Sequence, residues 1–334
     1  MEKLKNVQRE YEQGVLVTGL QQTVKQYLEY WIEDVQKTKI RLTTYQSYCS
    51  ILKNHLIPGL GHIRLQKLTA QHVQSFYAKR QREGCSASRV RNIHLVLHNA
   101  LGHAKRLKLV ASNVCDDVEL PHTEQYEAQP LTPEQARLLL QKMREHHLEA
   151  LLTLALTTGM RKGELSGLRW QDIDLENGTL YVRRTLLYIP HYGFKEAEPK
   201  TAKSRRKIVL SQFVIDVLRR HRTLQLEARL KAGLIWVDRD LVFCDKRGGF
   251  LQPMTLTRQF SRLLEEMGLP HIRFHDLRHS AATLLLSMGV PMKVVQEILG
   301  HSNFNVTANL YSHVLPTMQQ EAMSKMDEFL RHQS

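Results

Sequence analysis

A short acidic stretch divides the chain into two parts of different character. Residues 111–128 contain five acidic side chains, no lysine or arginine, and Pro121, and they show no clear helical or strand period. Such a segment is typical of a linker between domains. The chain has 334 residues, which is enough for a separate hydrophobic core on each side of this linker. The sequence therefore predicts two domains.

Positive charge is concentrated just before the acidic stretch. The chain has a formal net charge of +14, and residues 37–110 alone carry 14 basic side chains against one acidic side chain, Glu83. Solvated protein surfaces normally mix the two signs. The excess therefore favours a surface that faces nucleic acid, although basic side chains that only keep the domain soluble are the alternative.

The first part of the chain has the apolar spacing of helices. Helices are expected at 24–35, 43–56, 70–82 and 87–107. Thr69 is a candidate N-cap for the third of these helices. We therefore expect a small all-helical domain at residues 21–110, preceded by an N-terminal extension at residues 1–20.

The second part of the chain mixes helices with a few strands. Helices are expected at 132–144, at 147–158 and from about 212 onward, strands at 178–185 and 207–210, and a loop at 190–205. Thr132 followed by Pro133 is a typical helix start. The second domain is thus predicted to be mostly helical with a small sheet.

Composition argues against several classes of protein. The longest apolar runs, such as residues 148–157, are well short of the ~20 residues of a membrane-spanning helix. The charged N-terminus has no apolar core, so we expect no secretory signal. The four cysteines form no CxxC pair, which is typical of reduced thiols in a cytoplasmic protein rather than of a disulfide framework or a zinc site. They are Cys49, Cys85, Cys115 and Cys244.

An arginine directly follows a glycine turn in the second domain. Arg161 comes two residues after Gly159, near an expected helix start, where backbone N–H groups also favour anions. Glu164 lies three residues further on, so Arg161 could instead form an ordinary ion pair on a surface helix. This segment alone leaves both interpretations open.

A histidine and a second arginine are spaced to share one helical face. His275 and Arg278 are three residues apart. A guanidinium can hold two phosphate oxygens, and an imidazole beside it can exchange a proton near neutral pH. A metal site is the competing interpretation, because His271, His275 and His279 recur every four residues. It is disfavoured, since no carboxylate motif accompanies them and Arg278 would repel a cation.

Two further residues near the C-terminus fit the same chemistry. His301 follows Gly300, and Tyr311 lies ten residues later. A tyrosine near a C-terminus usually serves packing. Here it accompanies two arginines and two histidines, and a phenolate is a nucleophile that can attack phosphorus.

Taken in chain order, these residues resemble the active-site pattern of the tyrosine recombinase (phage integrase) family over most of the chain. The pattern is Arg161, Lys200, His275-x-x-Arg278, His301 and Tyr311. The resemblance implies a fold that is mainly α with a small antiparallel β-sheet. It also implies a two-domain DNA clamp, in which an all-α, SAM-like core-binding domain at residues 21–110 precedes an α+β catalytic domain at residues 129–316.

The resemblance also implies a role for each residue of the pattern. Arg161 and Arg278 would hold the scissile phosphate, and Glu164 would orient the site. Lys200, with Lys203 as the alternative, would protonate the leaving 5′ oxygen, while the basic run 203–207 would mainly contact backbone phosphate. The remaining roles are those of general acid/base, second hydrogen-bonding group and nucleophile, which fall to His275, His301 and Tyr311.

The implied activity is that of a site-specific DNA recombinase that integrates or excises a mobile element through a 3′-phosphotyrosine, without metal or cofactor. Relaxation of DNA by a type IB topoisomerase and a non-catalytic architectural role on DNA are the alternatives. The implied partners are duplex DNA, other copies of this chain in a tetramer on two duplexes, and accessory directionality or DNA-bending proteins.

The two ends and the linker complete these expectations. Residues 317–334 carry an apolar helical stripe that would dock on a neighbouring protomer or fold back on its own domain. Residues 1–20 are too short and too acidic for the arm-binding domain of some phage integrases. Asn113-Val114 stands where family members often have Asn-Pro, which departs from the family pattern at the linker.

Overall fold

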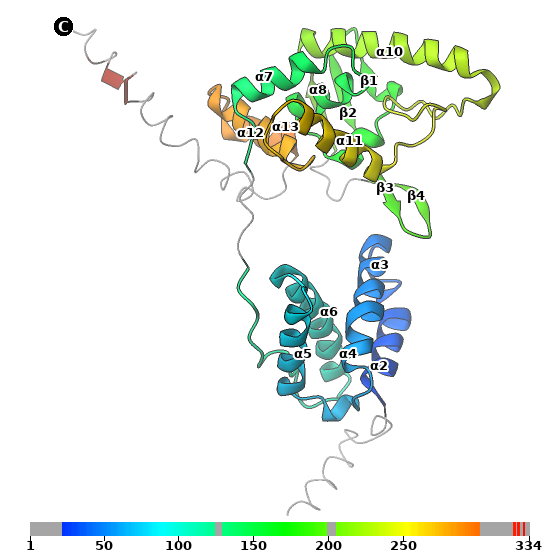
Figure 1. Cartoon of the computed structure of the whole chain (residues 1–334), viewed down its shortest axis with the longest axis vertical. Helices are drawn as coiled ribbons and strands as arrows, with labels where there is room; N and C mark the ends of the chain where they lie inside the picture. The colour runs from blue at the N-terminus through cyan, green and yellow to red at the C-terminus, as the bar shows by residue number, and fades with distance from the viewer. Residues whose placement is uncertain are drawn as a thin grey trace, which may run out of the picture. The chain divides into compact units, whose positions relative to one another are not determined.

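The computed structural model describes residues 22–123, 129–198 and 205–300, together with residues 323, 324, 326, 327 and 330. The chain forms two compact units, Met1–Tyr126 and Glu127–Ser334 (Figure 1). The fold is mainly helical with small antiparallel sheets, so the predicted fold class is confirmed. No helix within the described ranges has the length and apolar character needed to cross a membrane.

The first unit is a bundle of helices, several of which run on directly from one another. Its elements are α2 (Val24–Tyr30), the π-helical turn η1 (Trp31–Gln36), α3 (Leu42–Ile51), the π-helical turn η2 (Leu52–Leu56), α4 (Ile57–Leu60), the 3₁₀ turn η3 (Leu65–Lys67), α5 (Ala70–Arg82) and α6 (Ala87–Arg106). Thr69 caps α5, since its hydroxyl accepts the His72 backbone N–H, and this prediction is confirmed. Large side chains such as Trp31, Tyr27 and Tyr77 fill the core.

The packing of the first unit continues into the acidic stretch. Cys115 is buried, and Val114 and Val118 lie against the core of the bundle. The Asn113 side chain donates to the His98 carbonyl (3.1 Å) and accepts the Cys115 backbone N–H (3.2 Å). Asn113 therefore ties the first residues of this stretch to α6.

The second unit is built around one helix that is buried along almost its whole length. Its helices are α7 (Pro133–Lys142), α8 (Glu149–Thr158), α9 (Lys162–Ser166), the 3₁₀ turn η4 (Trp170–Asp172), α10 (Gln212–Ala232), the 3₁₀ turn η6 (Gly233–Ile235), α11 (Pro253–Glu266), α12 (Asp276–Ser287) and α13 (Met292–Leu299). Helices α10 and α12 both pack against the central α8, whose residues from Ala150 to Leu156 are all buried.

Two small antiparallel sheets complete the second unit. β1 (Ile173–Asp174), β2 (Thr179–Val182) and β5 (Arg206–Val209) form one sheet in the order β1-β2-β5, and β3 (Thr185–Ile189) pairs with β4 (Gly193–Ala197) in the other. In the first sheet, Leu180 lies opposite Ile208 and Val182 opposite Arg206. The β3–β4 hairpin projects from the body of this unit (Figure 1).

The strand predictions for this region were partly wrong. The strand expected at 178–185 is broken, because Arg183 and Arg184 turn to the buried Asp172 and separate β2 from β3. The loop expected at 190–205 contains β4, whose Phe194 packs edge-on against Tyr188 of β3. A short strand with exposed Lys195 and Glu196 lacks the apolar alternation that would have revealed it.

Candidate active site

The first candidate arginine stands at a sharp turn between α8 and α9. Helix α8 ends at Gly159, whose φ of +60° lies in the left-handed region that favours glycine. A Cβ at Gly159 would come within 2.2 Å of Leu299 Cδ2, so glycine also permits the close approach of α13. Arg161 then serves as the N-cap residue of α9, and Glu164 accepts its backbone N–H (3.0 Å).

Glu164 joins two arginines inside the second unit. Arg161 Nη1 donates to Glu164 Oε1 (2.8 Å), and Arg206 Nη2 donates to Glu164 Oε2 (3.0 Å). Glu164 is only 3% exposed. Burial by itself would raise the pKa of this carboxyl, but the Arg206 charge and the bonds from both arginines lower the pKa below its ordinary value. The ionised, buried carboxylate is therefore not part of an ordinary surface pair.

The second candidate arginine meets the same turn from α12. Arg278 is 3% exposed, and its Nη1 donates to the carbonyl of Gly159 (2.7 Å). Burial and the positive charge of Arg161 lower the pKa of Arg278 to about 9, which leaves the guanidinium charged at neutral pH. The structure thus brings Arg161 and Arg278 together at the α8–α9 turn, although 117 residues of sequence separate them.

His275 lies at the start of α12, one turn before Arg278. Its backbone carbonyl accepts the Arg278 N–H (3.1 Å), and its ring packs edge-on against His279 with centroids 5.4 Å apart. The residue is exposed, but partial burial of the imidazole and the charges of His279 and Arg278 lower the pKa of His275 to about 4. The imidazole is therefore neutral at pH 7 and able to accept a proton.

The end of α13 also belongs to this group. Gly300 has a φ of +68° and closes the helix, and its carbonyl accepts Arg161 Nη2 (3.5 Å). His301 follows directly, but His301 and Tyr311 lie outside the described residues, as do Lys200 and Lys203. Of the predicted site residues, the structure therefore describes Arg161, Glu164, His275 and Arg278.

The histidines of the α12 region do not form a metal cluster within the ranges that the structure describes. No group of three or more His, Cys, Asp or Glu side chains there is arranged to hold a metal ion. His271 Nε2 is hydrogen-bonded to Ser261 Oγ (3.0 Å), and His279 packs against His275. Their spacing of four residues therefore does not bring these three side chains together in the described part of the second unit.

Arg206 is a member of the site that sequence reasoning missed. The basic run 203–207 was interpreted as a contact for backbone phosphate, yet the Arg206 side chain is only 6% exposed. The overlooked signal is strand alternation, since Arg206 lies two residues before the buried Ile208 and shares its face of β5. An arginine at such a position points into the unit.

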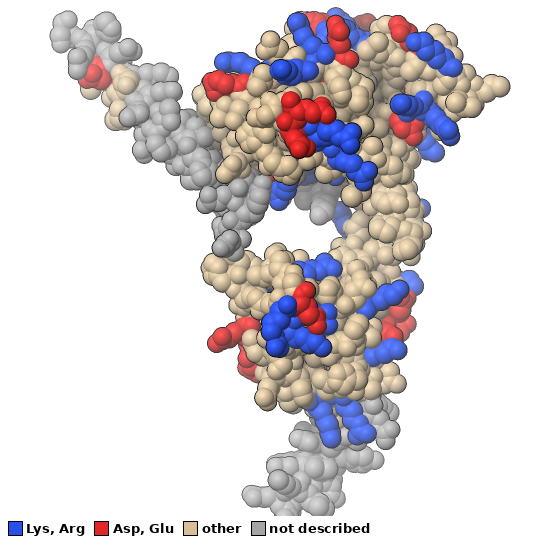
Figure 2. Space-filling view, in the orientation of Figure 1, with Lys and Arg blue, Asp and Glu red and all other residues tan. Residues whose placement is uncertain are grey.

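The basic side chains of the first unit lie on its surface. Of the 14 lysines and arginines between residues 37 and 110, all but Arg80 and Arg89 are exposed. On the face shown in Figure 2, lysine and arginine side chains stand out on both units, with acidic side chains among them. Over residues 37–110, the exposed cations are accompanied by only one acidic side chain, Glu83, so this range has the excess of positive charge that suits an anionic polymer.

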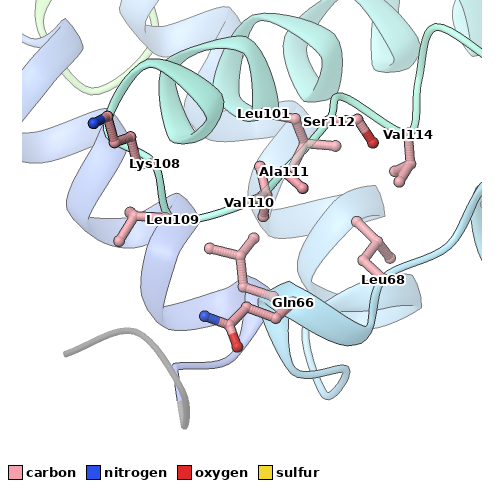
Figure 3. A pocket seen from close by; sticks show the side chains of 10 residues that line it. Gln66, Leu68, Leu101, Lys108, Leu109, Val110, Ala111, Ser112 and Val114 are labelled. Carbon is pink, nitrogen blue, oxygen red and sulfur yellow. The ribbon is translucent and has the colours of Figure 1, made fainter. Parts of the chain in front are cut away.

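A surface pocket of about 300 Å³ lies in the first unit, between η3 and the residues that follow α6 (Figure 3). Its lining is mostly aliphatic, with Lys108 as the one charged residue. None of the candidate catalytic residues lines this pocket. This pocket and the arginine cluster around Glu164 therefore lie in different units.

Both units match known families. Residues 129–318 match the Phage integrase family, and residues 23–80 match the family described as Phage integrase, N-terminal SAM-like domain. A tyrosine recombinase XerC-like protein from Caldanaerobacter subterraneus subsp. tengcongensis is 29% identical over 92% of this chain and 83% of its own. The ICEBs1 integrase from Bacillus subtilis is 26% identical over 86% of this chain and 78% of its own.

Solved structures share the fold. The integrase of the Tn1549 transposon, in complex with a circular intermediate DNA, superposes with a TM-score of 0.76 at 22% identity, over 90% of this chain and 99% of that one. A lambda integrase tetramer bound to a Holliday junction gives a TM-score of 0.65 at 21% identity, over 86% of this chain and 80% of that one.

Proposed function

Since the chain belongs to the phage integrase family, we propose that it is a site-specific DNA recombinase of a mobile element, which cleaves and rejoins DNA through a 3′-phosphotyrosine. The observation that carries this proposal is the meeting of Arg161 and Arg278 at the α8–α9 turn, beside the end of α13. Two guanidinium groups there suit the scissile phosphate, because they neutralise charge that grows on its oxygens in the transition state.

The proposed reaction begins with Tyr311 as nucleophile. Its phenolate oxygen attacks the phosphorus, an O–P bond to Tyr311 forms, and the bond from phosphorus to the 5′ oxygen breaks. His275 accepts the phenol proton, which its neutral imidazole allows. Lys200, or Lys203 in its place, gives a proton to the leaving 5′ oxygen, and His301 hydrogen-bonds the phosphate.

The second half of the reaction reverses the first on another strand. A 5′ hydroxyl attacks the phosphotyrosine, the bond to Tyr311 breaks, and the phosphodiester re-forms. The phosphotyrosyl bond keeps the energy of the phosphodiester, so rejoining needs no ATP. In this proposal neither a metal ion nor an organic cofactor takes part.

The proposal assigns a task to each part of the chain. Residues 21–110 bind duplex DNA, residues 129–316 carry the chemistry, and residues 111–128 link them. The segment 317–334 docks on a neighbouring protomer, and four copies assemble on two duplexes in the cytoplasm, with accessory directionality or DNA-bending proteins. The exposed cations of the first unit support the DNA-binding task proposed for residues 21–110.

A nicked suicide substrate tests the proposal. A nick close to the cleavage site lets the short product strand diffuse away, so the covalent protein–DNA adduct accumulates. Wild type should form this adduct and Tyr311→Phe should not, as denaturing gel electrophoresis will show. Tyr192→Phe, at an exposed tyrosine of the same unit, is the matched control and should form the adduct normally. An adduct with Tyr311→Phe would refute the assignment of the nucleophile.

A further inference from the structure

We infer that Arg206 is a positioning residue, which holds three parts of the active site in register through Glu164 and the end of α13. The inference rests on the proposed recombinase function and deepens it. Arg206 Nη2 donates to Glu164 Oε2 (3.0 Å), and Arg206 Nε donates to the carbonyl of Ile298 (2.6 Å). One planar guanidinium thus joins α9 to α13, a geometry that suits arginine and not lysine.

The first part that Arg206 holds is the phosphate-binding arginine of α9. Glu164 gives one carboxylate oxygen to Arg161 and the other to Arg206. Because Glu164 is buried, removing one of its two cationic partners shifts the balance between its charged and neutral forms. Arg206 therefore helps to keep Glu164 ionised, and the ionised carboxylate fixes the direction of the Arg161 side chain.

The second part is the last turn of α13, which leads into His301. The final carbonyl groups of a helix have no partner within the helix and favour positive charge nearby. Two of them are occupied here, since Ile298 accepts Arg206 and Gly300 accepts Arg161. The two arginines that share Glu164 therefore also hold the end of α13, so this end is fixed relative to α9.

The third part is β5, the strand that follows Lys200 in the sequence. Arg206 is the first residue of β5 and lies opposite Val182 of β2. The neighbouring strand β4 pairs with β3, and β3 packs against α9 so closely that a Cβ at Gly163 would lie 2.5 Å from Thr185 Oγ1. The strands β4 and β5 are thus both held with reference to α9.

The contacts of Arg206 suit support better than direct chemistry. Its Nη2 is engaged by Glu164 and its Nε by the carbonyl of Ile298, so its guanidinium joins α9 to α13 inside the unit. Its replacement should therefore disturb the alignment of groups that touch the phosphate, rather than the strength of DNA binding. A displacement of about 1 Å at a reacting centre can cost on the order of 10²-fold in rate.

Single-turnover cleavage of the nicked substrate, at saturating enzyme, tests this role. Arg206→Gln should cleave on the order of 10²-fold more slowly than wild type. Its DNA affinity should stay within about threefold of wild type, a difference in binding free energy of ~0.65 kcal/mol. Arg206→Lys keeps the charge near Glu164 and should recover part of the rate. The matched control is Arg229→Gln, at a half-exposed arginine of α10 that pairs with Asp238. This control should cleave at the wild-type rate.

The pH profile separates positioning from a general loss of structure. With Arg206 replaced by Gln, less positive charge faces Glu164, so its pKa rises and the acid limb of the cleavage profile moves to higher pH. In a Glu164→Gln background the same replacement should shift nothing. If Arg206→Gln does not fold, the test uses Arg206→Lys instead. A reduced cleavage rate at unchanged DNA affinity in that variant supports the inference.

Two outcomes would overturn the inference without touching the proposed function. A wild-type enzyme that forms the Tyr311 adduct, together with an Arg206→Gln variant of unchanged rate and pH profile, would exclude positioning. An Arg206→Lys variant at the full wild-type rate would exclude it as well. Failure of the wild-type chain to form any adduct would instead refute the recombinase proposal.

Discussion

In the first unit the basic side chains lie at the surface, whereas in the second unit several arginines are wholly or partly buried and lie close to carboxylates. Between residues 37 and 110 all but two of the lysines and arginines are exposed. In the second unit Arg278 is 3% exposed and Arg206 6% exposed. Exposed cations attract polyanions over a distance, and dissolved salt weakens this attraction. A buried cation lowers the stability of the fold unless an anion pairs with it.

Two buried carboxylates, Glu164 and Asp172, hold arginines in place in the second unit. Glu164 holds Arg161 and Arg206, and Asp172 holds Arg184 at the break between β2 and β3. Removing one partner of such a pair leaves an uncompensated buried charge. Under the proposed function, similar side chains would serve DNA affinity in one unit and the alignment of a reacting centre in the other.

The largest expected effect is on the rate of DNA cleavage. Arg278→Ala should lower single-turnover cleavage by on the order of 10²–10³-fold, comparable with the loss of one oxyanion donor. Its affinity for DNA should fall less than tenfold, because the cations of the first unit remain. A variant that cleaves at the wild-type rate would show that Arg278 only packs against Gly159.

An intermediate effect is expected on the salt dependence of DNA binding. Lys53→Gln and Lys67→Gln remove exposed charges of the first unit, and each DNA phosphate that a variant no longer neutralises should reduce the slope of log K against log [salt] by ~0.9. Binding is measured by fluorescence anisotropy between low and high salt. Lys231→Gln, at the exposed end of α10, is the control. Equal slopes for all three variants would contradict a DNA-facing surface on the first unit.

The smallest expected effect is on stability in mild acid. Burial lowers the pKa of His94 in the first unit, and burial likewise lowers the pKa of His221 in the second. A folded-state pKa below the unfolded value of ~6.5 means that the unfolded chain takes up protons first. Stability is therefore full above about pH 6.5 and declines as the pH falls toward the folded-state pKa.

Tryptophan fluorescence can follow this decline in each unit when the tryptophans of the other unit are replaced by phenylalanine. The chain has three tryptophans, of which Trp31 lies in the first unit and Trp170 and Trp236 in the second. Urea midpoints should fall between pH 7 and pH 5 for both signals, and His94→Gln should weaken the pH dependence of the Trp31 signal alone. Midpoints that rise on acidification would contradict these pKa directions.

Local patterns in the sequence were sufficient for most of the helices. The predicted helix at 70–82 has the observed bounds of α5, because the Thr69 cap and the apolar spacing are signals within one segment. The hairpin strand β4 was missed, since its stability comes from Phe194 packing on Tyr188 and on the distant Phe250. The contact with Phe250, which is far away in the sequence, is not visible in a local window.

The candidate site shows the same limit. Motif order predicts Arg161, His275 and Arg278 as site residues, whereas it places Arg206 in a basic run expected to contact backbone phosphate. Its partners Glu164 and Ile298 lie 42 and 92 residues away. Burial of a charged side chain depends on such tertiary partners, so only the alternation along β5 could have indicated it.

The division of labour between the units can be tested by one titration. Single-turnover cleavage of a nicked duplex is measured against enzyme concentration for wild type, for Arg278→Ala, and for a first-unit variant that combines Lys53→Gln with Lys67→Gln. We predict that the first-unit variant reaches the wild-type maximal rate at higher enzyme concentration, while Arg278→Ala has a low maximal rate at nearly the wild-type half-saturation. The opposite pattern, a reduced maximal rate in the first-unit variant and full recovery of Arg278→Ala at high enzyme concentration, would contradict the account.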